Sequence, residues 1–428
     1  YEAAPKLVER YGDKVAISLI GPGGEMLMAS AGIQNIDKDK VPSRIAARGG
    51  LGAVMGSKRI KAIVFDESGG ERPPIADPDA FRAATREFTK ALGAHPVVKS
   101  FEEYGTAGMV RMCDGFGAIP TRNFSDGKFE GAEKISGEHL RDLLTSRPNA
   151  DPSHACMAGC IIRCSNVYTD EVGDEVVSPV EYETIGLMGS NLDIDSLDDI
   201  ARLNYHVNDL GLDSIEIGAA LGVCCEAGLM EFGDAARGVE LIDEIRQGTA
   251  LGRVIGNGAG MVGKVYGVER VPVVKNQAIS AYDPRAIKGT GVTYATSPQG
   301  ADHTAGLTIR LPMDHTAIEG QVEASRNGQR AMAGLDSLGV CIFTGGGWAT
   351  SGSAMSDLLN ARYGWDVDNS IQLELGMAAV DMEREFNRQA GFTKADDRLP
   401  EWMTREQLPP LNVVFDVPDE EMDKVFDW

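Results

Sequence analysis

The chain has 428 residues, of which 43% are hydrophobic and 25% charged, as is typical of a globular protein with roughly two or three domains. Its formal net charge of -23 argues against nucleic acids and anionic membrane surfaces as partners, because both attract basic proteins. No run of about 18 uncharged apolar residues predicts a membrane-spanning helix, and no secretory signal is evident, so we expect a cytoplasmic enzyme or binding protein.

A small β-containing segment is predicted at the start of the chain. Residues 14–32 contain two apolar runs around a Gly-Pro-Gly-Gly turn, which predicts two short strands. Residues 59–65 predict a third strand, because they are apolar and partly β-branched. Residues 66–78 are rich in turn formers and lack periodicity, so they predict a linker.

Most of the chain beyond residue 77 is predicted to be helical. Residues 77–94 begin with a capping Asp and carry apolar side chains at helical spacing. Residues 195–211 and 368–391 have the same pattern, and each opens with Asp and closes on Gly. The expected fold class is therefore α+β and multi-domain, with a β-containing segment followed by a large helical body.

Three cysteines lie close together in the stretch "HACMAGCIIRCSN". Cys156, Cys160 and Cys164 are spaced by four residues, and Gly159 provides a turn between them. A metal cluster needs thiolates gathered in this way and one distant cysteine, which Cys341 supplies. The pattern favours an iron–sulfur cluster, with a tetrahedral zinc site as the next candidate.

Two other interpretations of these cysteines stay open from the residues alone. A spacing of four also places three side chains on one face of a helix, where they would be core residues, as we expect for Cys224 and Cys225. A disulfide is the weaker alternative, because three nearby cysteines leave one thiol unpaired and the total of seven is odd.

Two short runs share a polar-x-x-Gly-apolar-(Asp/Cys) pattern. The first is residues 208–213, "NDLGLD", and the second is residues 336–341, "DSLGVC". The pair predicts two helix ends that present polar groups to one ligand. Asx residues near glycine are also common turn formers, so the pattern alone is weak.

With these motifs the chain resembles the aldehyde:ferredoxin oxidoreductase family, the tungsten- or molybdenum-pterin enzymes. The resemblance covers all but the N-terminal part of the family chain. The motifs that carry it, in family order, are "RIAARGGLGAVMGSKRIKAIV", "GAIPTRNF", the cysteine run, "VEYETIGLMGSN", "NDLGLD", "YDPRAIKGTGVTYATSPQGADH", "DSLGVC" and "EREFNRQAGFTKADDRLP".

The resemblance implies three domains and their cofactors. Residues 1–70 would be the remnant of an N-terminal β-rich, pterin-binding domain, followed by helical domains at 71–270 and 271–428. The cofactors would be a [4Fe–4S] cluster, a tungsten or molybdenum ion held by two pyranopterins, and Mg²⁺ bridging the pterin phosphates. The implied ligands of the cluster are Cys156, Cys160, Cys164 and Cys341.

The resemblance also implies the residues around the pterins. The segment "RIAARGG" would hold the phosphates through guanidinium forks and bare backbone N–H groups. The alternative is that this segment has a structural role only and forms a tightly packed helix of small residues. The implied phosphate-binding residues are Arg44, Ala47, Arg48, Gly49 and Gly50; Asn208, Leu212 and Asp213 would contact one pterin, and Asp336, Val340 and Cys341 the other.

Glu183 and His303 match the family positions nearest the metal. Aldehyde oxidation needs removal of a proton from water or a hydrate, for which Glu183 could be the general base, while His303 holds or polarises the oxygen. Glu181 stays open as an alternative carboxylate. His303 has the alternative of a helix-cap or core histidine.

The implied function is oxidation of aldehydes to carboxylic acids, with electrons passed through the cluster to ferredoxin or another electron-carrier protein. Alternatives are a related metallopterin reductase acting on an aromatic thioester or an unknown substrate, and an inactive, cofactor-free fragment. A homo-oligomer is open as well. The cysteine run departs from the family by its longer first spacing, and Val340 replaces a frequent leucine.

Overall fold

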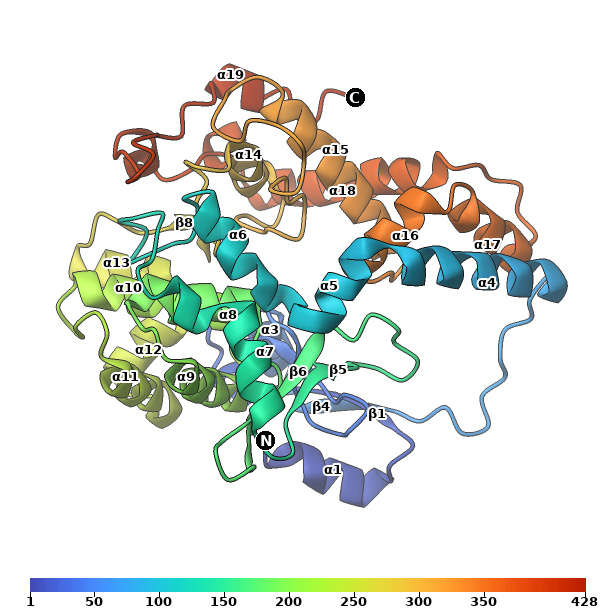
Figure 1. The fold of residues 1–428 in the computed structure, drawn as a ribbon, viewed down its shortest axis with the longest axis horizontal. Helices are drawn as coiled ribbons and strands as arrows, with labels where there is room; N and C mark the ends of the chain where they lie inside the picture. Colours follow the sequence, from blue (N-terminus) through green and yellow to red (C-terminus); the bar gives the residue numbers. More distant parts are fainter.

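The computed structural model describes residues 1–428 and has the predicted α+β architecture, with three small antiparallel sheets among many helices. Figure 1 shows the N-terminal sheet at the bottom of the molecule and the C-terminal helices at the top. One hydrophobic core of 66 buried residues extends from Met28 to Phe426. The division into three domains at residues 70 and 270 stays a prediction. None of the helices is both long and apolar enough to cross a lipid bilayer.

The four-stranded sheet near the N-terminus has the order β3-β2-β1-β4. The first and third predicted strands are confirmed as β1 and β4. The strand predicted directly after the Gly-Pro-Gly-Gly turn is wrong, because Pro22, with its fixed φ, starts a helical turn. The elements of this part are α1 (Ala3–Tyr11), β1 (Ala16–Leu19), α2 (Pro22–Glu25), β2 (Ile33–Asn35), β3 (Arg44–Ala46), α3 (Leu51–Ser57) and β4 (Ala62–Phe65).

The segment "RIAARGG" forms an edge strand and a turn. Residues 44–46 pair with β2, and residues 47–50 then turn before α3 begins. Gly49 and Gly50 both have positive φ values, 86° and 70°, which side chains other than glycine adopt at a cost. The packed-helix alternative for this segment is therefore wrong.

A second sheet follows the first four α-helices of the helical body, α4 to α7. The order is β5-β6-β7, and the loop between β5 and β6 contains the three clustered cysteines. The elements are α4 (Pro78–Ala94), α5 (Pro96–Tyr104), η1 (Gly105–Gly108), α6 (Met109–Gly115), η2 (Ala132–Ile135), α7 (Gly137–Ser146), β5 (Asp151–His154), β6 (Ser165–Thr169) and β7 (Glu175–Val177).

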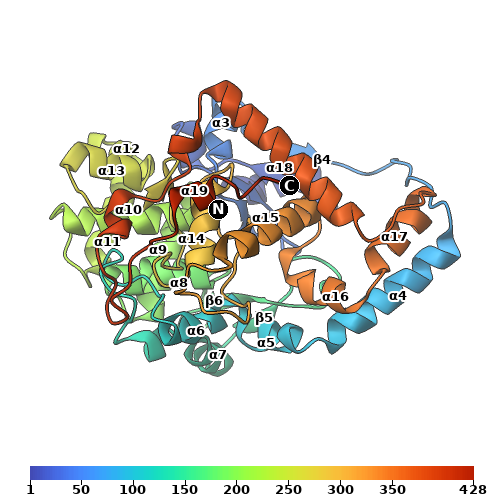
Figure 2. The same ribbon diagram turned by 90° about the horizontal axis from the view of Figure 1, so that it is seen from above.

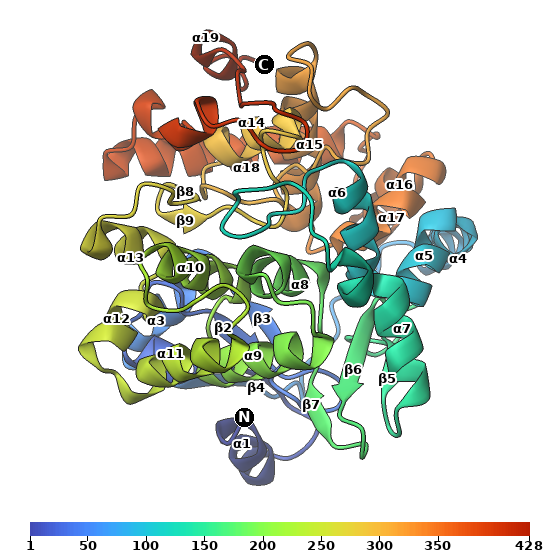
Figure 3. The ribbon, with the colours of Figure 1, turned by 60° about the vertical axis from the view of Figure 1, so that its left-hand side comes forward.

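The central helices form a layer beside the first sheet (Figure 3). The helix predicted at residues 195–211 is confirmed as α9, although Ser196 rather than Asp195 caps it, and Gly211 ends it in the left-handed region. The elements are α8 (Tyr182–Met188), η3 (Ser190–Leu192), α9 (Leu197–Leu210), α10 (Ser214–Glu226), α11 (Ala235–Gln247), α12 (Ala250–Gly256), α13 (Ala259–Tyr266), β8 (Val273–Val274) and β9 (Gln277–Ala278).

The C-terminal helices reach back to the start of the helical body. The predicted helix at residues 77–94 is confirmed as α4, with Asp77 as its cap, and it packs against α16 and α17 (Figure 2). The helix predicted at 368–391 is α18, which packs along α15. The elements are α14 (Lys288–Thr296), α15 (Gln321–Ser337), η4 (Ile342–Thr344), α16 (Gly345–Thr350), α17 (Ala354–Tyr363), α18 (Ile371–Ala390), η5 (Lys394–Asp396), η6 (Glu401–Thr404) and α19 (Asp419–Met422).

A buried carboxylate joins three of these elements. Glu216, on α10, is only 6% exposed. One carboxylate oxygen accepts a hydrogen bond from the N–H of Ala259 at 3.0 Å, and the other accepts from the N–H of Ala278 at 2.7 Å. Burial and the nearby carboxylate of Asp213 raise the pKa of Glu216 to about 7, while Arg48 and the two N–H groups oppose this.

We predict that Glu216 makes stability depend on pH. Because its folded-state pKa lies above the unfolded value of 4.5, its contribution is complete below about pH 4.5 and is lost as the pH rises through about 7. Urea unfolding of the wild type and of Glu216→Gln should be followed between pH 5 and pH 8. Over this range the free energy of unfolding of the wild type should fall by on the order of 3 kcal/mol relative to that of the variant.

The exposed carboxylate of Glu240, on α11, provides the control. Glu240→Gln should leave the pH dependence of the wild type intact. A difference between the wild type and Glu216→Gln that stays constant over this pH range would contradict the assignment.

Candidate functional site

The three clustered cysteines lie on a loop, not on a helix. The loop connects β5 to β6, and Gly159 and Arg163 turn it through positive φ values of 81° and 52°. The helix-face interpretation of the four-residue spacing is therefore wrong. All seven cysteines are free thiols, so the disulfide interpretation has no support either.

Cys341 comes to this loop from the segment after α15. Cys160 and Cys164 pack against a small apolar cluster that also contacts Phe343, two residues beyond Cys341. The ring of Phe343 lies 4.6 Å from that of Phe101, on α5. This packing holds the end of α15 beside the cysteine loop.

The four thiols are close enough to act on one another. Burial raises the pKa of Cys156, the thiols of Cys160 and Cys341 raise it further, and the Arg44 guanidinium lowers it. Burial likewise raises the pKa of Cys341, with Cys160 among the further causes. Burial also raises the pKa of Cys164. Four thiols held together, with a cation beside them, are the donor set that an iron–sulfur cluster needs.

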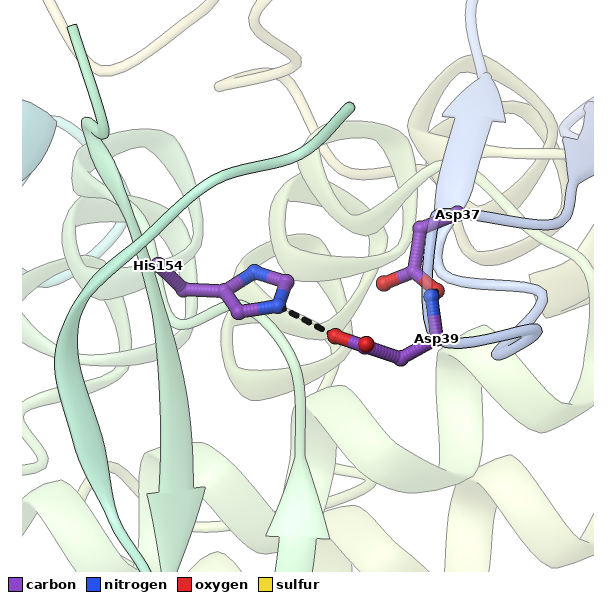
Figure 4. Close-up of side chains that lie close together, drawn as sticks. All are labelled: Asp37, Asp39 and His154. Atoms are coloured by element: carbon purple, nitrogen blue, oxygen red, sulfur yellow. Dashed lines mark hydrogen bonds and ion pairs between the residues drawn. The ribbon is translucent and has the colours of Figure 1, made fainter. Parts of the chain in front are cut away.

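A network of charged side chains orients Arg44. Figure 4 shows three of its members, Asp37, Asp39 and His154, with the hydrogen bond between His154 and Asp39. Arginine has only N–H donors, so Nδ1 of His154 must accept from Nη2 of Arg44 at 3.3 Å, and its Nε2 then donates to Oδ2 of Asp39 at 2.7 Å. Lys38 lies 2.6 Å from the same oxygen, and Oδ2 of Asp37 is 3.8 Å from Arg44.

The same network has the composition of a metal site. The ligand atoms of Asp37, Asp39 and His154 lie within 4.8 Å of one another. Two cations, Lys38 and Arg44, already face these atoms and would repel a metal ion. We therefore interpret the group as an ion-paired support for Arg44.

Arg48 is buried, and the protein binds four of its five N–H donors. Its Nε contacts Oδ2 of Asp213 at 3.1 Å, and its Nη1 donates to Oγ of Ser280 at 3.0 Å and to the carbonyl of Ala301 at 2.5 Å. Its Nη2 donates to the carbonyl of Ala278. Burial alone would lower the pKa of Arg48, but the carboxylate of Asp213 and others nearby raise it. Arg48 thus fixes the turn at residues 47–50, and its role in holding a phosphate stays a prediction.

Both Asx-x-x-Gly runs end a helix, as the pattern predicts. Asn208 lies in the last turn of α9, which Gly211 ends, and Asp336 lies in the last turn of α15, followed by Gly339 with a φ of 67°. Asp213 then caps α10 by accepting from the N–H of Ile215. The two helix ends flank the turn at residues 47–50.

A cavity of about 510 Å³ lies on the Arg44 side of this turn. Arg44 and Ala47 form one wall, and Asn208 and Leu212 come from the end of α9. Nε of Arg44 is buried without a hydrogen-bond partner, so the guanidinium can still bind a ligand. Glu181 also lines this cavity, and burial raises its pKa.

A second cavity, of about 710 Å³, lies on the Arg48 side. Arg48, Gly49 and Asp336 line it, as do Gln329 and Glu383, which sequence reasoning missed. Gln329 is 2% exposed and its Oε1 has no hydrogen-bond partner. Such an orphaned acceptor fits a ligand that brings N–H donors, and a pterin ring carries them on its amino-pyrimidinone edge.

Further carboxylates make this second cavity rich in acceptors. Burial raises the pKa of Asp336, and the neighbouring carboxylate of Asp302 raises it further. Burial also raises the pKa of Glu383, with Asp336 and Asp302 as further causes. No spacing in the sequence connects Glu383, on α18, with the end of α15, so only the fold identifies this group.

A third cavity, of about 230 Å³, lies against the glycines of the turn. It is lined by Ala47, Gly49, Gly50 and Asp213. A Cβ at Gly50 would lie 2.8 Å from the carbonyl of Ala29, so only glycine lets the backbone pass here. The predicted residues Val340 and Cys341 line none of the three cavities.

Glu183 and His303 meet side by side. Glu183 is in the first turn of α8, and its Oε2 accepts from the N–H of Ala281 at 2.8 Å. Its Oε1 lies 3.3 Å from Nε2 of His303 but makes no aligned hydrogen bond. His303 lies in a loop, 17% exposed, so it is neither a helix cap nor a core histidine. Of the two candidate carboxylates, it is Glu183 that contacts His303.

Comparison with known proteins identifies the family of this chain. The family model described as "Aldehyde ferredoxin oxidoreductase, domains 2 & 3" matches residues 83–427, and that of the N-terminal domain matches residues 1–67. The tungsten-containing aldehyde ferredoxin oxidoreductase of Thermococcus kodakarensis is 34% identical over 422 residues, which cover 93% of this chain and 67% of that protein. Its namesake from Pyrococcus horikoshii is 33% identical over 439 residues, covering 95% of this chain and 69% of that protein.

A solved structure also shares the fold. It is the active-site complex BamBC of benzoyl coenzyme A reductase, with a TM-score of 0.72 and 16% identity, covering 100% of this chain and 72% of that chain. At this identity the likeness concerns the fold alone. From the family models and the relatives, the chain belongs to the aldehyde ferredoxin oxidoreductase family, a family of oxidoreductase enzymes.

Proposed function

We propose that the protein oxidises aldehydes to carboxylic acids at a tungsten- or molybdenum-pterin centre and passes the electrons through a [4Fe–4S] cluster to ferredoxin or another carrier. The observation that carries the proposal is the position of residues 44–50. Arg44, at one end of the segment, lowers the pKa of the Cys156 thiol. Arg48, near the other end, is linked to His303 by hydrogen bonds through Ser280. Cavities of about 510 and 710 Å³ lie on the two sides of this segment.

The four thiols would hold the cluster. All four cysteines are free, namely Cys156, Cys160, Cys164 and Cys341. Burial raises the pKa of three of these thiols, those of Cys156, Cys164 and Cys341. Iron would stabilise their thiolate forms, and the Arg44 guanidinium would offset part of the added negative charge. The remaining cysteines lie away from this loop: Cys113 is on α6, and Cys224 and Cys225 are on α10.

The two large cavities would hold one pterin each. Arg44, Ala47, Asn208 and Leu212 would contact the first, and Arg48, Gly49 and Asp336 the second; Gly50 and Asp213 would complete the cradle for the phosphates, with Mg²⁺ between them. The unpaired Nε of Arg44 suits an anionic group, and the unpaired Oε1 of Gln329 suits an N–H donor. When bound, the metal supplies a site that takes up two electrons from the substrate.

Glu183 and His303 would handle the protons and the oxygen. Glu183 keeps one oxygen on the N–H of Ala281 and the other free of hydrogen bonds, as a general base requires. His303 can donate from Nε2 to the oxygen of the aldehyde or its hydrate. The thioester and sulfonate chemistries are less favoured, since the relatives of higher identity are named as aldehyde enzymes.

The first test is the metal content and activity of protein purified without oxygen. We expect about four irons and one tungsten or molybdenum per chain, and reduction of a ferredoxin or viologen dye by an aldehyde. Protein that contains tungsten or molybdenum and iron but oxidises no aldehyde would refute the substrate class. Protein with zinc and no iron would refute the cluster.

We predict that Cys160→Ala and Cys341→Ala each abolish the visible absorbance of the cluster, because each removes one of four thiolate ligands. Iron per chain should fall with the absorbance. The control is Cys225→Ala, which removes a partly buried thiol from α10. An unchanged spectrum in either ligand variant would overturn the ligand assignment.

Glu183→Gln should lower kcat by about 100-fold or more while metal content stays at the wild-type level, because an amide cannot accept the proton. The amide oxygen can still accept from the N–H of Ala281, so the local fold is kept. Glu181→Gln, on the preceding loop, should have a much smaller effect on kcat. The reverse order of the two effects would make Glu181 the base.

A further inference from the structure

We infer that Ser280 is a positioning residue that holds His303 as the neutral tautomer with its proton on Nε2, the nitrogen that lies 3.3 Å from Oε1 of Glu183. The inference deepens the proposed function, since its catalytic meaning rests on the roles given there to Glu183 and His303. The geometry itself does not depend on those roles. Ser280 follows β9 and is fully buried.

The chemistry of Arg48 fixes the direction of its hydrogen bond to Ser280. A guanidinium has donors only, so Oγ of Ser280 must accept from Nη1 of Arg48, at 3.0 Å. The hydroxyl has one proton left to donate, and Nδ1 of His303 lies 3.0 Å away. We infer that this proton is donated to Nδ1, which then accepts and leaves the ring proton on Nε2.

The charged groups around His303 support the same tautomer. Asp302, on the same loop, is 3.8 Å from Nδ1, beyond hydrogen-bond distance, and its oxygens accept from Thr304 instead. Arg48 polarises the Ser280 hydroxyl, which strengthens its donation to Nδ1 and opposes a proton there. Glu183 is the carboxylate on the Nε2 side, at 3.3 Å. The ring of Tyr282 packs on the imidazole at 5.8 Å and brings no charge.

This tautomer gives the pair its chemistry. Nε2–H is a donor, and its neighbour, Oε1 of Glu183, has no aligned hydrogen bond, so both groups can turn to one substrate oxygen and its proton. The opposite tautomer would place a lone pair against the carboxylate and lose the donor. Because Arg48 also fixes the turn at residues 47–50, a single hydroxyl links that turn to the orientation of His303.

The test reads the tautomer directly. The chain has six histidines, so the holoenzyme labelled with ¹⁵N-histidine gives few signals, and His303→Gln assigns those of His303. In long-range ¹H–¹⁵N spectra we expect Nδ1 of His303 without a proton and Nε2 with one. In Ser280→Ala this pattern should be lost, whereas Ser280→Thr, which keeps the hydroxyl, should retain it. A proton on Nδ1 in the wild type, or an unchanged pattern in Ser280→Ala, would overturn the inference.

Kinetics and a control variant complete the experiment. Ser280→Ala should lower kcat about 10-fold or more with KM little changed, and Ser280→Thr should restore it, because orientation of the donor is lost and not binding. Ser356→Ala removes another buried hydroxyl, on α17, that lies within hydrogen-bond distance of two acceptors. This variant should leave the signals of His303 unchanged. If no aldehyde is oxidised, the proposed function fails while the spectra still decide the role of Ser280.

Discussion

The buried guanidinium of Arg48 is the interaction on which the site depends. A cation that is only 10% exposed must be matched by acceptors, and Arg48 finds them on Asp213, Ser280 and two backbone carbonyls. These acceptors belong to segments far apart in the sequence: the start of α10, the end of β9 and the loop that leads to His303. The edge strand β3, the central helices and the catalytic pair therefore share one anchor. Because the cation would be left unpaired if any segment moved, the geometry of the whole site is held in one arrangement.

The two arginines of "RIAARGG" have different roles, although they are only four residues apart. Arg44 keeps a free Nε in a cavity and acts on the thiol of Cys156, while its other nitrogens are held by Ser165 and His154. Arg48 uses four of its five N–H donors on the protein itself. An acidic protein can thus bind anionic cofactors with few cations, provided that each cation is oriented by its own network. The acceptors of the second cavity, with Gln329 among them, complement the donors of a pterin ring.

The sequence predicted the elements well where local chemistry decides. The caps and periodicity of α4, α9 and α18 were sufficient, and so were the apolar strands β1 and β4. The strand predicted after the Gly-Pro-Gly-Gly turn was wrong. At the cysteine run, the spacing left a helix face open as an alternative to a cluster on a turn, and the run lies in a loop. In both places a proline or a glycine with positive φ sets the backbone, and periodicity carries no information about such turns. Ser280, Gln329, Glu383 and Glu216 gave no signal, since a single polar residue in a sequence does not show what it faces.

By itself the sequence determined the residue types, their order and the helix ends that carry the two Asx-x-x-Gly runs. Those features are local, because a cap, a glycine or a thiol acts through its own backbone and chemistry. Only the tertiary structure decided that Glu183 and not Glu181 meets His303, and that Ser280 lies between His303 and Arg48. Two of these contacts, Glu183 with His303 and Arg48 with Ser280, join residues more than 100 positions apart, and Ser280 lies 23 positions before His303. Their distances are set by the packing of α8, β9 and the turn before α3. Packing is a property of the whole core: the resemblance placed Glu183 and His303 near one metal, but no motif pointed to Ser280.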